Sequence, residues 1–172
     1  MYLVKTNSSG AVEWETTHGA TGDGLANAVQ QTEDGGYILA GWSEFNASGE
    51  RAAHLVKTDA AGALEWEAFF DGAGEASANA VRQTGDGGYA AVGYTADRDD
   101  GRLSLYLWKT DGQGALQWER THGGPGVQTS AFDVQPTEDG GYIAAGWIFR
   151  EETENTSMFA VKTNSRGRAP EL

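Results

Sequence analysis

The chain contains no cysteine, three prolines and two methionines among its 172 residues. Without cysteine there can be no disulfide framework, no thiolate metal site and no cysteine nucleophile. No stretch approaches the run of about 18 apolar residues that a membrane-spanning helix needs, so we expect no membrane insertion. The opening stretch MYLVKTNSSG has no charged leader followed by an apolar run, so it predicts a strand and not a signal peptide.

Positive charge is scarce as well, because 12 basic residues face 25 acidic ones and the formal net charge is −13. Such a surface repels a phosphate backbone, so we expect no nucleic-acid partner. Few lysines, many acidic residues and many small residues together resemble the proteins of salt-loving microbes. In molar salt the Debye length falls to about 3 Å, which screens self-repulsion. An ordinary acidic, soluble surface is the alternative.

An internal repeat with a period of about 52 residues covers almost the whole chain. We divide a single domain, 1–172, into repeats 2–53, 54–105 and 106–157, a partial repeat 158–165 and a C-terminal tail 166–172. The repeated positions are four lysines, three tryptophans and three Asp-Gly-Gly-Tyr stretches: Lys5, Lys57, Lys109 and Lys162; Trp14, Trp66 and Trp118; Asp34, Gly35, Gly36 and Tyr37; Asp86, Gly87, Gly88 and Tyr89; and Asp139, Gly140, Gly141 and Tyr142.

Each period reads as four short antiparallel strands. The stretch YILAGW is an apolar run with aromatic ends, which is typical of a strand buried on both faces. The stretch ALEWE alternates, with Leu64 and Trp66 on one face. Asp-Gly between two strands predicts a type I′ hairpin turn, and the stretch DAAG predicts a second tight turn with its glycine in the left-handed region. No segment shows the periodicity of a helix.

Four-stranded units of this length predict an all-β fold of β-propeller blades, about three of them, in which each sheet packs on its neighbours. A β-sandwich does not need a near-exact repeat, and solenoid coils are usually shorter, so both alternatives are poorer matches. We expect Gly41, Gly93 and Gly146 to mark close packing between adjacent sheets, where a Cβ would not fit.

The stretches DGGYILAGW, HLVKTDAAGALEWE and THGG resemble a bacterial and archaeal family of β-propeller repeats. The resemblance covers residues 2 to 165, and the WD40 and kelch repeats are poorer matches. It implies an extracellular or cell-surface protein, in which such repeats often stand beside adhesive or carbohydrate-associated modules. It implies no particular activity, and this chain departs from the family in being short and without a leader.

The number of strands leaves the propeller incomplete. Labelled A to D from the inside outward, the strands read C-D, A-B-C-D, A-B-C-D, A-B-C. Closed propellers usually have about four to eight blades, so the ends of this chain would be open to pairing. One hypothesis is a homo-oligomer, in which the leading D strand, Ala11–Glu15, completes a blade begun by residues 131–163 of a second copy. The other is that the chain is a fragment of a larger propeller protein.

Few residues are candidates for metal binding or acid–base chemistry. His18 and His122 stand at equivalent positions, and could serve together with Asp71 if loops of separate blades converge. The middle repeat has Phe70 at the same position, which favours a packing role. The aspartates of the Asp-Gly turns could bind calcium, but turn geometry alone explains them and the EF-hand spacing is absent. We therefore expect no cofactor and assign no catalytic residue.

The function follows from how regular the repeat is. The three repeated tryptophans could form a ring for carbohydrate stacking, although their place on alternating strands favours packing between blades. The residues that break the repeat are Phe70, Asp71, Trp108 and Pro125, and they form no evident catalytic constellation. We expect a non-enzymatic module for binding or scaffolding, with a carbohydrate or protein ligand held by variable loops. A carbohydrate-active hydrolase or lyase, with carboxylates at the channel mouth, is the alternative.

Overall fold

The computed structural model describes residues 1–19, 22–44 and 49–169, which form strands and turns without a helix. The strands are β1 (Tyr2–Thr6), β2 (Val12–Thr17), β3 (Gly24–Gln31), β4 (Tyr37–Glu44), β5 (Arg51–Thr58), β6 (Leu64–Phe70), β7 (Ala76–Gln83), β8 (Tyr89–Ala96), β9 (Leu103–Thr110), β10 (Leu116–His122), β11 (Val127–Pro136), β12 (Tyr142–Arg150) and β13 (Asn155–Thr163). In these ranges no helix is long and apolar enough to cross a membrane.

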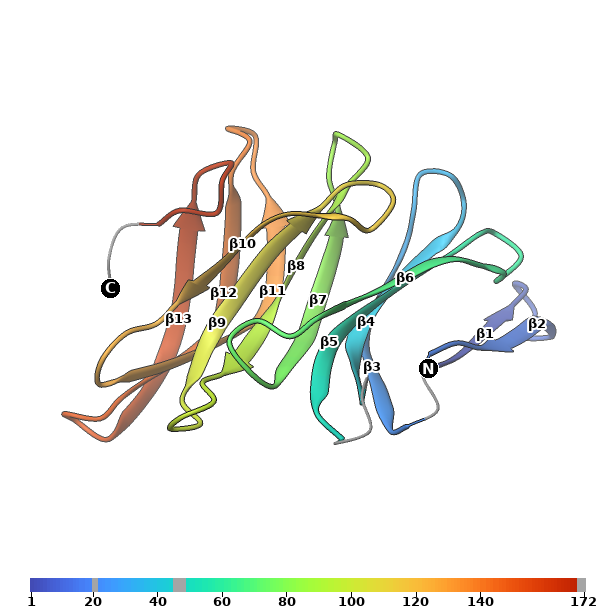
Figure 1. Cartoon of the computed structure of the whole chain (residues 1–172). Coiled ribbons are helices and arrows are strands. Elements are labelled where there is room, and N and C mark those ends of the chain that lie inside the picture. The colour runs from blue at the N-terminus through green and yellow to red at the C-terminus, as the bar shows by residue number, and fades with distance from the viewer. Residues whose placement is uncertain (20–21, 45–48, 170–172) are drawn as a thin grey trace.

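The strands form four antiparallel sheets, in each of which every strand pairs with its neighbours in the chain (Figure 1). The N-terminal sheet is β1–β2, sheet 1 is β3–β4–β5–β6, sheet 2 is β7–β8–β9–β10, and the C-terminal sheet is β11–β12–β13. The prediction of an all-β fold is confirmed, and so is the succession of two, four, four and three strands. Each sequence repeat begins on the third strand of a sheet, so the period is offset from the sheets.

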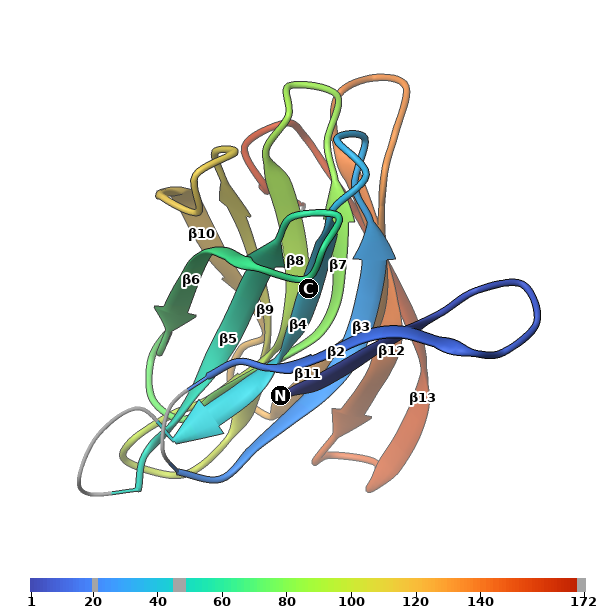
Figure 2. The same cartoon turned by 90° about the vertical axis from the view of Figure 1, so that its right-hand side faces the viewer.

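The sheets stand face to face in a row. Strand β7 contacts β3, β4 and β5 of the sheet before it, and β11 contacts β7, β8 and β9 in the same way. One apolar core lies between sheets 1 and 2 and includes Ile38, Leu55 and Val81. A second core lies between sheet 2 and the C-terminal sheet and includes Leu107 and Val134. The N-terminal and C-terminal sheets lie at opposite ends of the row (Figure 1), and Figure 2 looks along the row from the N-terminal sheet.

The Asp-Gly hairpin turns differ from the expected type. After β3, the Gly35 amide donates to the Thr32 carbonyl at 2.9 Å, and the Thr32 amide donates to the Gly36 carbonyl at 2.9 Å. Gly35 has φ of +84°, but among the described residues Glu154 is the only non-glycine with positive φ, so Asp34 does not. The predicted type I′ turn is therefore wrong, because only one of its central residues enters the left-handed region.

The second tight turn has the predicted geometry. Gly62 has φ of +82° and its amide donates to the Asp59 carbonyl at 3.1 Å. The same turn follows β13, where the Gly167 amide donates to the Asn164 carbonyl at 3.0 Å. The predicted tail 166–172 thus begins inside a turn of the repeat, and residues 170–172 lie outside the described part of the chain.

The repeated glycines Gly41, Gly93 and Gly146 mark a close approach within one sheet. Each lies on a second strand, opposite the β-bulge of the first strand of the same sheet. A Cβ on any of them would overlap a carbonyl oxygen of that first strand. The oxygens belong to Leu25, Ser77 and Ser130, in that order. The predicted packing between adjacent sheets is therefore wrong, because the bulge brings neighbouring backbone over the glycine.

We expect Gly93→Ala to lower the free energy of unfolding by about 2–3 kcal/mol, because rigid backbone must move to admit the methyl group. Gly85→Ala is the matched control, since nothing lies within 4 Å of a Cβ at that position. Urea denaturation of both variants measures the difference. Equal midpoints for the two variants would contradict the close approach at the bulge.

Candidate functional site

Each complete sheet holds its Asp-Gly turn to its third strand through a lysine. In sheet 1, Lys57 Nζ donates to Asp34 Oδ2 at 2.9 Å, to the Thr58 carbonyl at 2.9 Å and to Glu65 Oε2 at 2.6 Å. The Lys57 side chain is only 2% exposed. Its ammonium group is the main cause that lowers the pKa of Asp34 to about 2, followed by hydrogen bonds from the turn's own hydroxyl and amide. The Asp34 carboxylate is therefore already paired within its own sheet.

Sheet 2 repeats this network with one carboxylate fewer. Lys109 Nζ donates to both carboxylate oxygens of Asp86 at 3.0 Å and to the Thr110 carbonyl at 2.8 Å. Gln117 Oε1, 3.2 Å away, stands where sheet 1 has a glutamate. Hydrogen bonds from Thr84 and then from Lys109 lower the pKa of Asp86 to about 2. Asp86 is thus the carboxylate that balances a lysine side chain only 4% exposed.

At the two ends of the row the lysines are exposed. Lys162 Nζ donates to Asp139 at 2.7 and 2.9 Å, and this lysine side chain is 43% exposed. The Lys162 ammonium lowers the pKa of Asp139 well below its ordinary range. Lys5 pairs with Glu13 of β2, as Lys57 pairs with Glu65, and its two-stranded sheet has no Asp-Gly turn to add a second carboxylate. The carboxylates considered for calcium therefore each have a lysine partner.

The repeated tryptophans lie at the junctions between sheets. The ring centroid of Trp14 is 5.7 Å from that of Tyr37, and Trp66 is 5.6 Å from Tyr89. Trp118 stands in the same relation to Tyr142, at 5.5 Å. Each indole also lies over the turn glycine of the next sheet, so closely that a Cβ there would overlap the ring. These glycines are Gly62, Gly114 and Gly167. The indoles therefore join each sheet to the next.

The candidate histidines serve the same junctions. His18 Nε2 lies 2.9 Å from the Gly62 carbonyl oxygen, and His122 Nε2 lies 3.0 Å from that of Gly167. With its proton on Nε2, each imidazole donates to the turn of the next sheet. Burial lowers the pKa of His122, which keeps the ring neutral near pH 7. Asp71 lies elsewhere, 3.9 Å from an Arg98 nitrogen.

The structure therefore does not bring the three metal candidates together. His18 belongs to the first junction of the row and His122 to the last. Within residues 1–19, 22–44 and 49–169, no group of three or more histidine, cysteine, aspartate or glutamate side chains could hold a metal ion.

Two residues that break the repeat compensate one another at the central junction. Phe70 stands where the outer junctions have histidine, and its ring centroid is 5.4 Å from that of Trp108. Trp108 stands where the neighbouring sheets have Val56 and Val161, and it also stacks on Tyr106 at 4.6 Å. All three aromatic side chains belong to the core between sheets 1 and 2. The departures from the repeat thus fill one shared volume.

A third histidine, His54, which no sequence motif singled out, has two side-chain partners. His54 Nδ1 lies 2.8 Å from Ser43 Oγ, and His54 Nε2 lies 3.1 Å from Glu67 Oε2. Serine, histidine and carboxylate in this order resemble a hydrolytic triad. However, Ser43 is only 3% exposed, so its hydroxyl is not open to a substrate.

The same position in neighbouring sheets explains His54 without catalysis. Tyr2 donates to Glu15 at 2.6 Å in the N-terminal sheet, and Tyr106 donates to Glu119 in sheet 2. His54 and Glu67 form the equivalent cross-strand pair of sheet 1. Glutamate recurs at 15, 67 and 119, and Tyr, His and Tyr stand at 2, 54 and 106, each diagonally across from its glutamate. This constant spacing is a signal in the sequence that could have found the pair.

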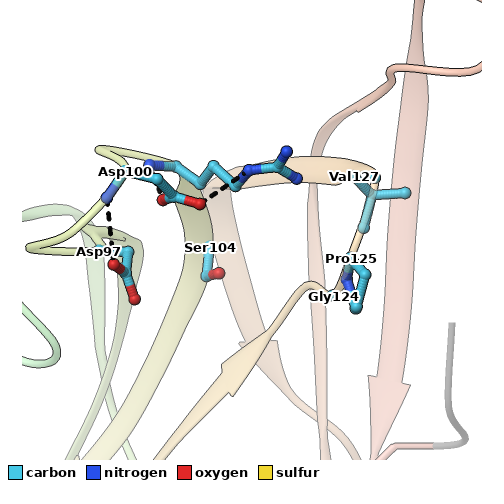
Figure 3. Close-up of a pocket in the computed structure, with 8 residues that line it drawn as sticks. Asp97, Asp100, Ser104, Gly124, Pro125 and Val127 are labelled. Carbon is cyan, nitrogen blue, oxygen red and sulfur yellow. Dashed lines mark hydrogen bonds and ion pairs between the residues drawn. The ribbon is translucent and has the colours of Figure 1, made fainter.

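One hollow lies where loops of unlike sequence meet (Figure 3). Its volume is about 430 Å³, between the β8–β9 loop of sheet 2 and the segment that links β10 to β11. One wall carries carboxylate, guanidinium and hydroxyl groups and the other is largely backbone and apolar. The lining residues are Asp97, Asp100, Arg102, Ser104, Gly124, Pro125, Gly126 and Val127.

Ion pairs fix the polar wall of this hollow. Arg102 Nε lies 2.9 Å from Asp100 Oδ2, and its terminal nitrogen lies 2.8 Å from Glu151 Oε1 of the next sheet's loop. Asp97 Oδ1 accepts the amide hydrogen of Asp99 at 2.8 Å, which closes the loop on itself. The guanidinium therefore ties the loops of two sheets together at the edge of the hollow.

Comparison with known proteins adds no assignment. No protein-family model matches the chain, and no curated protein is detectably similar to it. The resemblance to a family of propeller repeats therefore stays a prediction from the motifs.

Proposed function

We propose that this protein is a non-enzymatic binding module of the β-propeller type, with its ligand site among the variable loops. Two complete four-stranded meanders, packed face to face through the same tryptophan, tyrosine and glycine positions, support the propeller assignment. Exposed faces at both ends of the row support completion by a second copy, because each complete sheet uses both of its neighbours. A fragment of a longer propeller is the alternative explanation for those open ends.

The binding role rests on one observation: repeated residues hold the fold together, and variable residues line the hollow. The repeated side chains are used in turns and junctions, whereas the hollow is lined mostly by the β8–β9 loop and the segment that links β10 to β11. Loops carried on a rigid scaffold are the usual place for recognition. Pro125, one of the residues that break the repeat, is part of its apolar wall.

The lining favours a carbohydrate as ligand. Carboxylates and a guanidinium can accept from and donate to sugar hydroxyls, and the proline ring offers an apolar face. The hollow has no aromatic side chain for stacking, so binding would depend on hydrogen bonds. A protein ligand and a carbohydrate-active hydrolase or lyase are the alternatives that the experiment below distinguishes. The acidic composition and the family resemblance support a cell-surface setting in a salt-loving microbe.

We expect the parent protein to bind members of an immobilised panel of neutral and acidic oligosaccharides, measured in molar KCl. Arg102→Ala should weaken binding at least about ten-fold, because it removes a charged donor and frees the two loops that it ties. Arg98→Ala is the matched control, since Arg98 bridges to Glu50 at 3.1 Å outside the hollow. Release of shortened sugars would favour the hydrolase. Binding only to a peptide panel would favour a protein ligand. Equal binding by the two variants would mean that the ligand site lies outside this hollow.

A further inference from the structure

The chain contains its third-strand segment at both ends. Residues 1–10 read MYLVKTNSSG and residues 158–167 read MFAVKTNSRG, so the two segments differ only at Tyr2, Leu3 and Ser9 of the first. In the structure these segments form β1 and the end of β13, each followed by the same turn. A sheet shared between two copies would therefore have two candidates for its third strand, β1 of one copy and β13 of the other.

Strand β1 occupies the position on β2 that a third strand holds in a complete sheet. Leu3 lies opposite Thr16 and Lys5 lies opposite Trp14. In sheet 1 the same register places Leu55 opposite Ala68 and Lys57 opposite Trp66. The inner edge of β2 is thus already paired, by a strand of the same chain whose sheet lacks its first two strands.

The C-terminal sheet has the complementary deficiency. It contains a first, second and third strand but no fourth, so the outer edge of β13 has no strand partner among the described residues. Met158 at the start of this segment is 97% exposed, whereas the equivalent Ala53 and Leu105 are fully buried in sheets 1 and 2. In sheets 1 and 2 a fourth strand pairs with that edge of the third strand.

We propose that β1 occupies the place on β2 that β13 of a second copy takes in a dimer. The two copies join when β1 leaves β2 and the partner's β13 pairs with β2 in the same register. This inference rests on the assembly proposed above and adds which strand is exchanged. The shared sheet would then contain β11, β12 and β13 of one copy and β2 of the other. Two such sheets, with sheets 1 and 2 of each copy, would make a ring of six sheets related by a two-fold axis.

The contacts favour release of β1 and retention of β13. The turn after β13 is anchored to sheet 2, because Gly167 packs under Trp118 and accepts a hydrogen bond from His122 at 3.0 Å. The turn after β1 has no such anchor, since a Cβ on Gly10 would meet nothing within 4 Å. Strand β1 is also the shorter one, with five residues against nine.

The exchange would restore the lysine network at the end of the row. Lys162 has one carboxylate partner, Asp139, whereas the buried Lys57 has an aspartate and also a glutamate from the fourth strand. Glu13 of β2 is the equivalent glutamate, and it is now paired with Lys5. Moving Lys162 next to Glu13 would reproduce the three-way contact seen in sheet 1. The hydrogen bond from Tyr2 to Glu15 would be lost, because β13 has a phenylalanine at that position.

A pair of proline variants of the full chain tests the direction of the exchange. Leu3→Pro weakens β1 on β2, because Leu3 lies opposite Thr16 with its amide directed at β2, as the reciprocal bonds of Met1 with His18 show, and proline removes that donor. We expect it to tighten dimer formation at least about ten-fold, since a larger fraction of molecules has the β2 edge free. Ala160→Pro at the equivalent position of β13 should abolish the dimer. Light scattering on a sizing column in molar KCl measures the dimer in both variants. Loss of the dimer in the β1 variant together with a tighter dimer in the β13 variant would overturn the proposal.

Engineered disulfides locate the strands independently of how well the proline variants fold. The parent chain has no cysteine, so each pair reports one contact. Thr16→Cys with Ala160→Cys should link two copies, and Leu3→Cys with Thr16→Cys should close within one chain as the control for the unexchanged state. A dimer linked instead through Leu3→Cys and Ala145→Cys would mean that β13 leaves, which overturns the exchange but not the assembly. Monomers in the parent and in Leu3→Pro alike would overturn the assembly itself.

Discussion

Asp86→Asn is expected to destabilise the protein more than the same change at either equivalent aspartate. Lys109 is almost fully buried and would keep only uncharged oxygens as partners, those of the Thr110 carbonyl, the Gln117 amide and the asparagine itself. Loss of one partner of a buried ion pair costs about 3–5 kcal/mol, and the exposure of the carboxylate itself reduces this to about 2–3 kcal/mol. Denaturation in guanidinium chloride, which also holds ionic strength high, measures the loss.

The other two aspartates are matched controls. Asp34→Asn leaves Lys57 with Glu65 at 2.6 Å, so the loss should be smaller. Asp139→Asn should have the smallest effect, because both partners of that pair are exposed. An equal loss at all three positions would contradict the view that burial of the lysine decides the effect.

These aspartates also predict how acid acts on the fold. The pKa of Asp86 is about 2 in the folded protein and near 3.8 in the unfolded chain, so the unfolded state binds more protons between these values. The stabilising contribution is therefore complete above about pH 4 and is lost as the pH falls through 2. We expect the difference in unfolding free energy between parent and Asp86→Asn to shrink between pH 5 and pH 2. A constant difference would contradict the lowered pKa.

Trp108→Val is expected to lower the free energy of unfolding by about 3–4 kcal/mol, because it empties a large volume in the core between sheets 1 and 2. Phe70→His alone should also destabilise, since it places an imidazole against the Trp108 ring. The double variant reproduces the residues of the outer junctions, where histidine and valine occupy these positions.

The double variant should therefore lose less than the sum of the two single changes, by about 1–3 kcal/mol. In it, a histidine at position 70 would have the Gly114 carbonyl as acceptor, as His18 has Gly62. Thermal or urea unfolding of the four proteins gives the coupling energy. Simple additivity would mean that Phe70 and Trp108 are independent departures from the repeat.

The sequence by itself determined the order and number of strands, because strand periodicity and turn residues are local properties. Repetition of the same lysine, tryptophan and glycine positions made the period visible without any other protein for comparison. It also indicated that histidine in the THG stretches has a packing role, since Phe70 replaces it. Lysine restricted to one position per repeat was a sign that this charge has a fixed partner.

Only the tertiary structure decided which groups meet. The Asp-Gly motif is compatible with more than one turn type, and the backbone angles at Asp34 and Gly35 select between them. Gly41 has its close neighbour at a bulge in the adjacent strand, which no local pattern reveals. His54 pairs with Glu67 on the next strand, and Phe70 meets Trp108 from another sheet. Contacts of this kind join residues far apart in the chain, so they depend on register and on sheet packing and not on local preference.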